Sequence, residues 1–277
     1  MEPCFDLTGH TPPASPVILS VPHAGRDYPT VLHDALRVPF IALMALEDRL
    51  VDQVALAARG VETTIVQRAA RAWIDLNRAE HDRDPRLDDG ALAGHLSAKV
   101  RSGLGLVPRR TSGAGELWRR RLGADEVAAR IAAAHRPYHA ALSAALTAAR
   151  GRFGVAVLLD IHSMPPINGG RARIVIGDRF GRSAANRFIA RIEAAVTAAG
   201  LEQALNAPYA GGHILERHGD PKRQIHAVQL EIDRSLYLDG RLDQPGSGFD
   251  HAVALVRSII DALTDEAVDT PAALAAE

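Results

Sequence analysis

Two histidines and a glutamate stand where α/β proteins often carry their chemistry, at the ends of apolar runs. His23 follows the run 17–21 (VILSV), His162 follows VAVLLDI, and Glu231 ends AVQLE. Open α/β sheets bind ligands beyond the carboxyl ends of their strands. A catalytic zinc typically takes two histidines and one carboxylate, and leaves a fourth place for water. We therefore expect His23 and His162 to be metal ligands.

The third ligand is expected among two neighbouring acidic residues, Glu47 and Asp48. Both fall in the segment 39–58, whose periodicity predicts a helix. Adjacent helical residues point about 100° apart, so at most one of them can face the ion. We prefer Asp48, with Glu47 as the alternative. Asp160, two residues before His162 on the same side of a strand, is expected to orient that ring.

Polar residues also follow a further predicted strand, 71–76 (RAWIDL). Asn77 and Arg78 come directly after it. Arginine suits bidentate binding of a carboxylate, so Arg78 is a candidate to hold the substrate; a surface ion pair is its alternative, and a turn is the alternative for Asn77. Arg71 or Arg68 could stabilise a developing oxyanion, although a structural role suits each equally.

A Gly- and Pro-rich loop, 206–221, supplies the last candidates. Its glycines Gly211 and Gly212 would let the backbone approach a ligand closely, and Tyr209 is a candidate substrate contact. A plain turn explains the glycines equally well. Other histidines stand away from strand ends and are expected to be structural: His139, His218 and His251.

The order of the predicted elements defines the fold class. Strands alternate with helices, and the strands are apolar almost throughout, which is typical of a mainly parallel sheet covered on both faces. We predict one three-layer α/β domain over 1–277, with flanking helices. Within it we expect an extended leader at 1–15, an excursion or lid at 79–115 and a frayed tail at 266–277. The predicted strands are 17–21, 62–67, 71–76, 155–161, 173–177 and 225–232, and the helices are 39–58, 117–150, 183–199 and 249–263.

Composition excludes several classes of partner. The 277 residues carry 32 basic and 33 acidic side chains, so neither nucleic acid nor an anionic membrane is an expected partner. The single cysteine, Cys4, cannot form an internal disulfide, which favours the reducing cytoplasm. We see no signal peptide and no apolar run of the roughly 20 residues that a membrane span needs. The sequence carries no feature that sets an oligomeric state.

Six motifs, in order over residues 16–240, resemble the N-formylglutamate amidohydrolases. They are VPHAGRDYP, the ED pair, IDLNR, DIHSMP, PYAGGHI and QLEIDRSLY. That family is similar in turn to zinc carboxypeptidases and aspartoacylases. The resemblance implies a zinc-carboxypeptidase-like fold, also described as phosphorylase/hydrolase-like. It implies one zinc ion on His23 and His162, Glu231 as general base, and Asn77 with Arg78 around a substrate carboxylate.

One position departs from the carboxypeptidase pattern. There a glutamate comes three residues after the first histidine, whereas position 26 here is arginine, and Asp27 has the wrong spacing. The third ligand is therefore sought at Asp48 or Glu47.

The implied reaction is hydrolysis of the N-formyl amide of N-formyl-L-glutamate, or of a related N-acyl acidic amino acid, as in histidine catabolism. Formate and the amino acid would be the products. One alternative is a zinc peptidase that acts on short peptides, and another is a non-catalytic protein that binds metal or amino acid. The ligand types also suit other transition metals.

Overall fold

The computed structural model describes residues 4–92, 94, 96–111, 113–167 and 169–274. The chain forms two compact units that interleave along the sequence. We call them the sheet unit (Leu7–Val21, Arg49–Ile65 and Ala141–Glu277) and the loop unit (Met1–Asp6, Pro22–Asp48 and Val66–Ala140). Residues 1–3 of the predicted leader, 93, 95 and 112 of the predicted excursion, and 275–277 of the predicted tail lie outside the described residues.

A seven-stranded sheet, ordered β1-β3-β2-β6-β9-β7-β8, forms the centre of the fold. The pairs β2–β6, β6–β9 and β7–β8 are parallel, and β7 runs antiparallel to β9. The α/β class and the mainly parallel sheet were predicted from the sequence and are confirmed. The strands are β1 (Phe5–Thr8), β2 (Val17–Val21), β3 (Thr63–Gln67), β6 (Ala156–Met164), β7 (Ile174–Gly177), β8 (Gln203–Leu205) and β9 (Ile225–Asp233).

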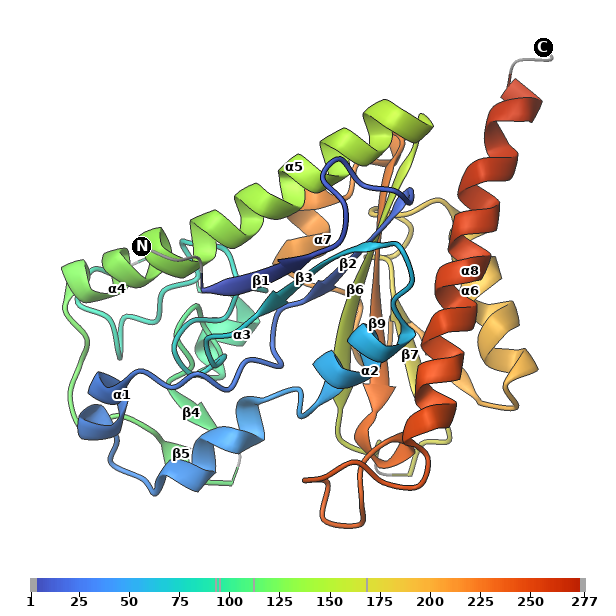
Figure 1. Cartoon of the computed structure of the whole chain (residues 1–277). Coiled ribbons are helices and arrows are strands. Elements are labelled where there is room, and N and C mark those ends of the chain that lie inside the picture. Colours follow the sequence, from blue (N-terminus) through green and yellow to red (C-terminus); the bar gives the residue numbers. More distant parts are fainter. Residues whose placement is uncertain (1–3, 93, 95, 112, 168, 275–277) are drawn as a thin grey trace. The chain divides into compact units, whose positions relative to one another are not determined.

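Helices cover both faces of the sheet in the sheet unit (Figure 1). On one face α2 and α8 pack against β2 and β6, and α6 packs on α8; on the other face α7 packs against β9 and β6. Every residue of β2 and β6 is buried, because apolar side chains on both faces meet a helix layer. The helices are α2 (Val51–Ala58), α6 (Asn186–Ala198), α7 (His213–His218) and α8 (Phe249–Leu274), with short 3-10 helices at Pro221–Arg223 and Arg234–Leu236.

The loop unit has little regular secondary structure, and contacts between side chains stabilise it. Its buried apolar residues include Leu43, Leu76, Leu106 and Leu117. The buried Arg109 forms ion pairs with Asp84 and Glu116. Its elements are α1 (Thr30–Ala35), the 3-10 helix η1 (Phe40–Leu46), α3 (Ala98–Arg101), β4 (Arg110–Thr111), β5 (Gly115–Glu116), α4 (Ala124–Arg130), a π-helical turn (Ile131–His135) and the start of α5 (Arg136–Phe153).

The predicted helix 117–150 begins only at Ala124. Two further predicted elements are wrong, and both matter for the site. The expected helix 39–58 is broken, because Glu47 is extended and Leu50 adopts a left-handed conformation with φ 56°. Asp48 therefore lies between η1 and α2 and not within a helix. The expected strand 71–76 is a series of turns: Trp73 N–H donates to Ala70 O, and Asp75 N–H donates to Leu106 O instead of a neighbouring strand.

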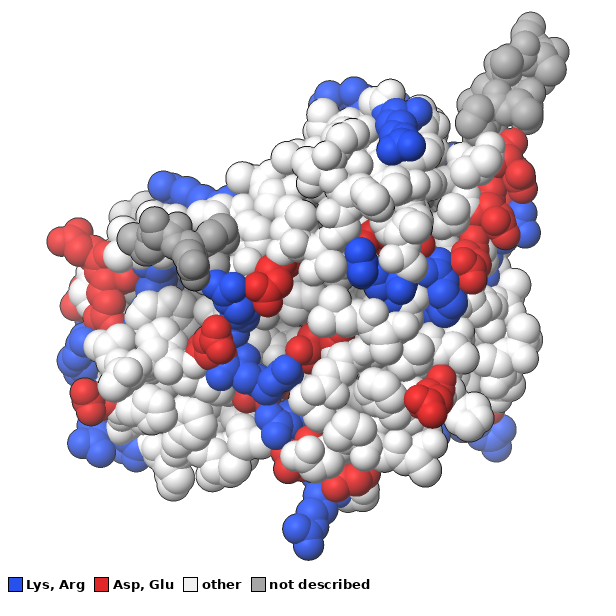
Figure 2. Space-filling view, in the orientation of Figure 1, with Lys and Arg blue, Asp and Glu red and all other residues white. Residues whose placement is uncertain are grey.

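The other predictions concern the ends of the chain and its surface. Residues 5–8 of the predicted leader form β1, and α8 continues to Leu274, past its predicted end. The single amidohydrolase domain over 1–277 stays a prediction. Among the described residues, no helix is long and apolar enough to cross a membrane. Acidic and basic side chains are interspersed on the face drawn in Figure 2, as the balanced composition leads one to expect.

Candidate active site

The first group of candidate residues gathers around His23 in the loop unit, just after β2. The His23 ring is buried, and its Nε2 lies 2.8 Å from Asp75 Oδ1. Its Nδ1 lies 3.6 Å from Asp48 Oδ2. The main chain supports the same pair, since Asp48 N–H donates to His23 O at 3.0 Å. The broken helix therefore brings Asp48 to His23 by a route that helical periodicity did not predict.

The two carboxylates that compete for the third-ligand role have different partners. Asp48 faces the His23 ring. Glu47, equally buried, accepts a short hydrogen bond from the Tyr28 hydroxyl. Because Glu47 is extended and not helical, the two side chains diverge for a reason other than the expected helical turn.

The donor set at His23 and Asp48 suits a divalent cation. Nε2–H donates to Asp75, so in the neutral imidazole Nδ1 presents its lone pair towards the Asp48 carboxylate. Two electron-pair donors thus face each other at 3.6 Å, beyond hydrogen-bond length. Bonds of about 2.0–2.1 Å in a tetrahedral zinc site place two ligand atoms about 3.4 Å apart. A cation between the two atoms would fit this separation.

Asp75 is the centre of this group, and sequence reasoning missed its role. Its carboxylate is fully buried and accepts hydrogen bonds from His23, from Arg71 Nε and from the Asn77 N–H. Burial alone would raise the pKa of Asp75, but Arg71, Arg78 and His23 together hold it well below its usual range. An ionised Asp75 therefore anchors His23 and both predicted substrate-binding positions. The only signal in the sequence was its place in IDLNR.

The arginines of this group differ in how their donors are used. Arg71 donates Nε and Nη2 to Asp75 and keeps 20% of its side chain exposed. Arg78 is more deeply buried; it donates Nε to Leu104 O and Nη1 to Asn77 O. Burial lowers the pKa of Arg78, although Asp75 opposes that shift. Leu104 belongs to the predicted excursion 79–115, so that segment contributes to the support of Arg78.

The second group lies in the sheet unit around His162. Its Nε2 lies 2.8 Å from Asp160 Oδ2, and the other carboxylate oxygen accepts from Ser20 Oγ at 2.6 Å. Asp160 therefore contacts and orients the ring, as the strand alternation predicted. His162 was expected to follow its strand, but β6 continues to Met164, so the residue lies inside it.

Glu231 belongs to the same group. It is the register partner of His162 on the adjacent parallel strand β9, so both side chains rise from one face of the sheet. Its Oε1 accepts from Gln229 Nε2 at 2.9 Å. Arg234, the partner in the alternative ion pair, donates Nε to Ser163 Oγ. Like His162, Glu231 lies within its strand and not at its end.

The glycine-rich loop approaches this face of the sheet. A Cβ on Gly177, the register partner of Gln229, would come within 3.0 Å of the backbone of Ala210 and Gly211. Gly211 itself has φ +101°, which favours glycine. Gly212 directly precedes α7, a helix that sequence analysis did not predict. Close packing of backbone on backbone thus explains Gly177, and it brings the loop with Tyr209 and Gly211 towards Gln229.

Comparison with known proteins agrees with these motifs. A family model for N-formylglutamate amidohydrolase matches residues 15–238. An N-formylglutamate deformylase from Pseudomonas putida is 31% identical over 81% of this chain and 82% of its own length. A second, from Pseudomonas aeruginosa, is 28% identical over the same shares.

Solved structures extend the likeness to three dimensions. An N-formylglutamate amidohydrolase from Ralstonia eutropha JMP134 superposes with a TM-score of 0.85 at 29% identity, covering 97% of this chain and 99% of its own. A gene product from Agrobacterium tumefaciens shares the fold, with a TM-score of 0.70 at 20% identity over 95% and 96% of the two chains. By sequence and by structure, the chain belongs to the N-formylglutamate amidohydrolase family.

Proposed function

We propose that this protein is a metal-dependent enzyme that hydrolyses the N-formyl amide of N-formyl-L-glutamate, or of a closely related N-acyl acidic amino acid. The family match and the names of the two Pseudomonas relatives support the substrate. The geometric observation that carries metal dependence is the 3.6 Å separation of His23 Nδ1 and Asp48 Oδ2. We place the reaction in histidine catabolism and in the cytoplasm, following the resemblance and the single cysteine.

The proposed ligands are His23, Asp48 and His162, with zinc as the ion. Each histidine has a buried carboxylate beside its Nε2, Asp75 in one case and Asp160 in the other. Such carboxylates fix the tautomer and the ring orientation of histidine ligands, which leaves Nδ1 for coordination. A bound divalent ion would lower the pKa of a water molecule and polarise the formyl carbonyl.

Glu231 is the proposed general base and acid. It takes a proton from the attacking water and passes it to the amine nitrogen that leaves with glutamate. The Gln229 amide donates to Oε1 of Glu231 and so orients its carboxylate. Glu231 is buried, and it shares a sheet face with His162, where the proposed ion would lie.

The arginines and the loop would bind and orient the substrate. Arg71, anchored by Asp75, stabilises the negative charge that develops on the carbonyl oxygen. Asn77 and Arg78 bind a substrate carboxylate, and their many bonds to the protein preorganise them for it. Tyr209, Gly211 and Gly212 contact the rest of the substrate.

Metal analysis of the purified protein, coupled to formate release from N-formyl-L-glutamate, tests this function. We expect one divalent ion and turnover that stops when a chelator removes it. Short dipeptides serve as the second substrate class. Preferred cleavage of dipeptides would establish a peptidase, and binding of ion and glutamate without turnover would establish a binding protein.

A further inference from the structure

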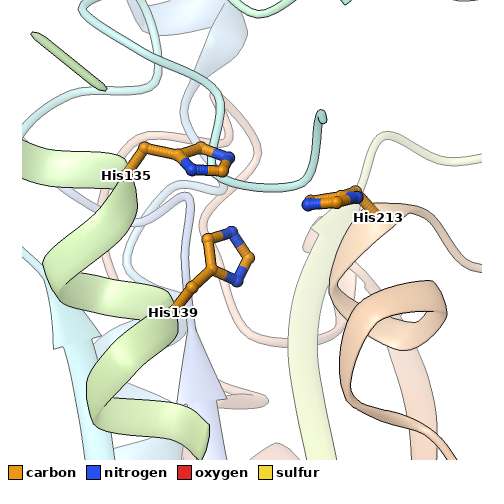
Figure 3. Close-up of side chains that lie close together, drawn as sticks. All are labelled: His135, His139 and His213. Atoms are coloured by element: carbon orange, nitrogen blue, oxygen red, sulfur yellow. The ribbon is translucent and has the colours of Figure 1, made fainter. Parts of the chain in front are cut away.

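Two histidines that the proposed reaction does not use lie directly behind its substrate-binding segment. His135 ends the π-helical turn and His139 lies one turn later in α5. Both side chains are fully buried, with ring centroids 4.4 Å apart, and they project from the same side of the helix (Figure 3). The third residue labelled there, His213, begins α7 and belongs to the sheet unit.

Each of the two rings is bonded to a carbonyl of the segment 76–78. His135 Nε2 lies 2.8 Å from Arg78 O, and His139 Nε2 lies 3.0 Å from Leu76 O. A carbonyl oxygen only accepts, so both Nε2 atoms carry hydrogen and donate. The two histidines are one helical turn apart, and this separation matches the distance between carbonyls two residues apart in the chain.

Side chains bond all three carbonyls of this segment. The carbonyl between those two, Asn77 O, accepts from Arg78 Nη1 at 2.6 Å. The segment belongs to no strand or helix, so its backbone conformation depends on these bonds. A buried carbonyl that loses its donor is costly, and the chain would move to satisfy it. The direction of Asn77 and Arg78 would change with that movement.

We propose that His135 and His139 are positioning residues that fix the backbone of residues 76–78 and thereby aim Asn77 and Arg78 at the substrate carboxylate. The expected effect on substrate binding rests on the proposed function. The support that the two histidines give to the backbone of residues 76–78 does not. The two imidazoles act on substrate affinity through the main chain of residues 76–78, to which they donate.

Matched substitutions separate the hydrogen bond from the volume of the ring. His135→Leu and His139→Leu remove the donor and leave an apolar side chain, whereas His135→Gln and His139→Gln place an amide N–H near the position of Nε2. His226→Leu, which removes another buried histidine from the sheet unit, controls for a general loss of stability. On each protein we would measure KM and kcat for N-formyl-L-glutamate, and amide hydrogen exchange of residues 75–79.

We expect each leucine variant to raise KM about tenfold, the effect of one lost interaction of ordinary strength, with kcat within about threefold of the wild type. The glutamine variants should recover most of the loss, and His226→Leu should leave KM unchanged. In an Arg78→Lys background, His139→Leu should raise KM by less than about twofold, because the two changes act on one contact. Exchange of residues 75–79 should quicken in the leucine variants alone.

Three results would overturn the proposal that these histidines fix the backbone of residues 76–78. They are unchanged amide exchange of residues 75–79 in both leucine variants, a KM as high in the glutamine variants as in the leucine variants, or effects of His139→Leu and Arg78→Lys on KM that are fully additive. These outcomes differ from failure of the proposed function, in which the wild-type protein releases no formate. In that case the exchange measurement still decides whether the two histidines hold the segment.

Discussion

His162 and Glu231 are register partners on the adjacent parallel strands β6 and β9, so their side chains rise side by side from one face of the sheet. Behind them Asp160 and Gln229, also register partners, bond to the imidazole and to the carboxylate respectively. These two pairs of register partners thus fix the orientation of the imidazole ring and of the proposed base. A sheet is a rigid support, which suits groups whose relative position must hold during proton transfer.

Glu231→Gln should abolish turnover and leave the metal in place. The amide keeps the shape of the side chain but cannot accept the proton of water, so kcat should fall by roughly 10²–10⁴-fold. Formate release and metal content would be measured on the same preparation. Glu202→Gln, at an exposed carboxylate of the sheet unit, is the control and should retain full activity. An active Glu231→Gln enzyme would refute the assigned base.

Asp48→Asn and Glu47→Gln should differ in metal content. Asp48 faces His23, so its amide variant should lose the ion and the activity together. Glu47 accepts from Tyr28, so Glu47→Gln should keep the ion. Mass-spectrometric metal analysis after dialysis measures the metal content of both variants. The reverse pattern would assign the ligand role to Glu47.

Asp75→Asn should weaken both stability and metal binding. The buried carboxylate faces Arg71 and Arg78, and removal of one partner from such a cluster costs roughly 3–5 kcal/mol of unfolding free energy. Loss of the bond to His23 should reduce zinc affinity by about 10–100-fold. Urea unfolding and zinc titration measure the two effects.

The matched control for Asp75 is Asp89, which forms an exposed ion pair with Arg121 in the same unit. Asp89→Asn should change the unfolding free energy by less than about 0.5 kcal/mol. Equal losses in the two variants would mean that burial and multiple partners give Asp75 no special role.

The stability of the protein should fall in mild acid because of His226. Burial, with a smaller contribution from Arg187, lowers the pKa of His226 from 6.5 to about 4. Between these values the unfolded chain binds a proton that the folded chain does not, so stability falls as pH drops from about 6.5 towards 4 and is unaffected by this group above that range. The contribution should reach roughly 2 kcal/mol.

His226→Gln keeps an acceptor for the Ala185 N–H and has no titration. The difference in unfolding free energy between wild type and variant should therefore change across this pH range, and then level off above pH 7. Carboxylates titrate in both proteins and cancel in the difference. A difference that stays constant from pH 4 to 7 would refute the assignment to His226.

Much of the fold was predictable because its central strands are mainly apolar. The apolar runs of β2, β6 and β9 are buried only if helices cover both faces of the sheet. His23, His162 and Glu231 lie within these strands or just after them. The break before Leu50 was not predictable, since neither glycine nor proline marks it. The partnership of His23 with Asp75 joins turns 52 residues apart, and no local periodicity encodes it.

Residues 71–76 show most clearly what could not be predicted from the sequence. Ile74 and Leu76 are buried, as apolar residues of a predicted strand should be. Their main chain bonds to turns and to Leu106, however, because the partner that a strand needs is a property of the tertiary fold. The pattern of side-chain burial was readable, and the hydrogen-bond partner was not.

We expect His23, Asp48 and His162 to hold one ion together. A crystal structure of the zinc-loaded protein, with anomalous scattering recorded on both sides of the zinc absorption edge, tests it directly. We expect one anomalous peak with two histidine nitrogens at about 2.0–2.1 Å and an Asp48 oxygen at about 2.0–2.2 Å. A peak bound to only one of the two histidines, or a zinc ion elsewhere in the protein, would contradict the account.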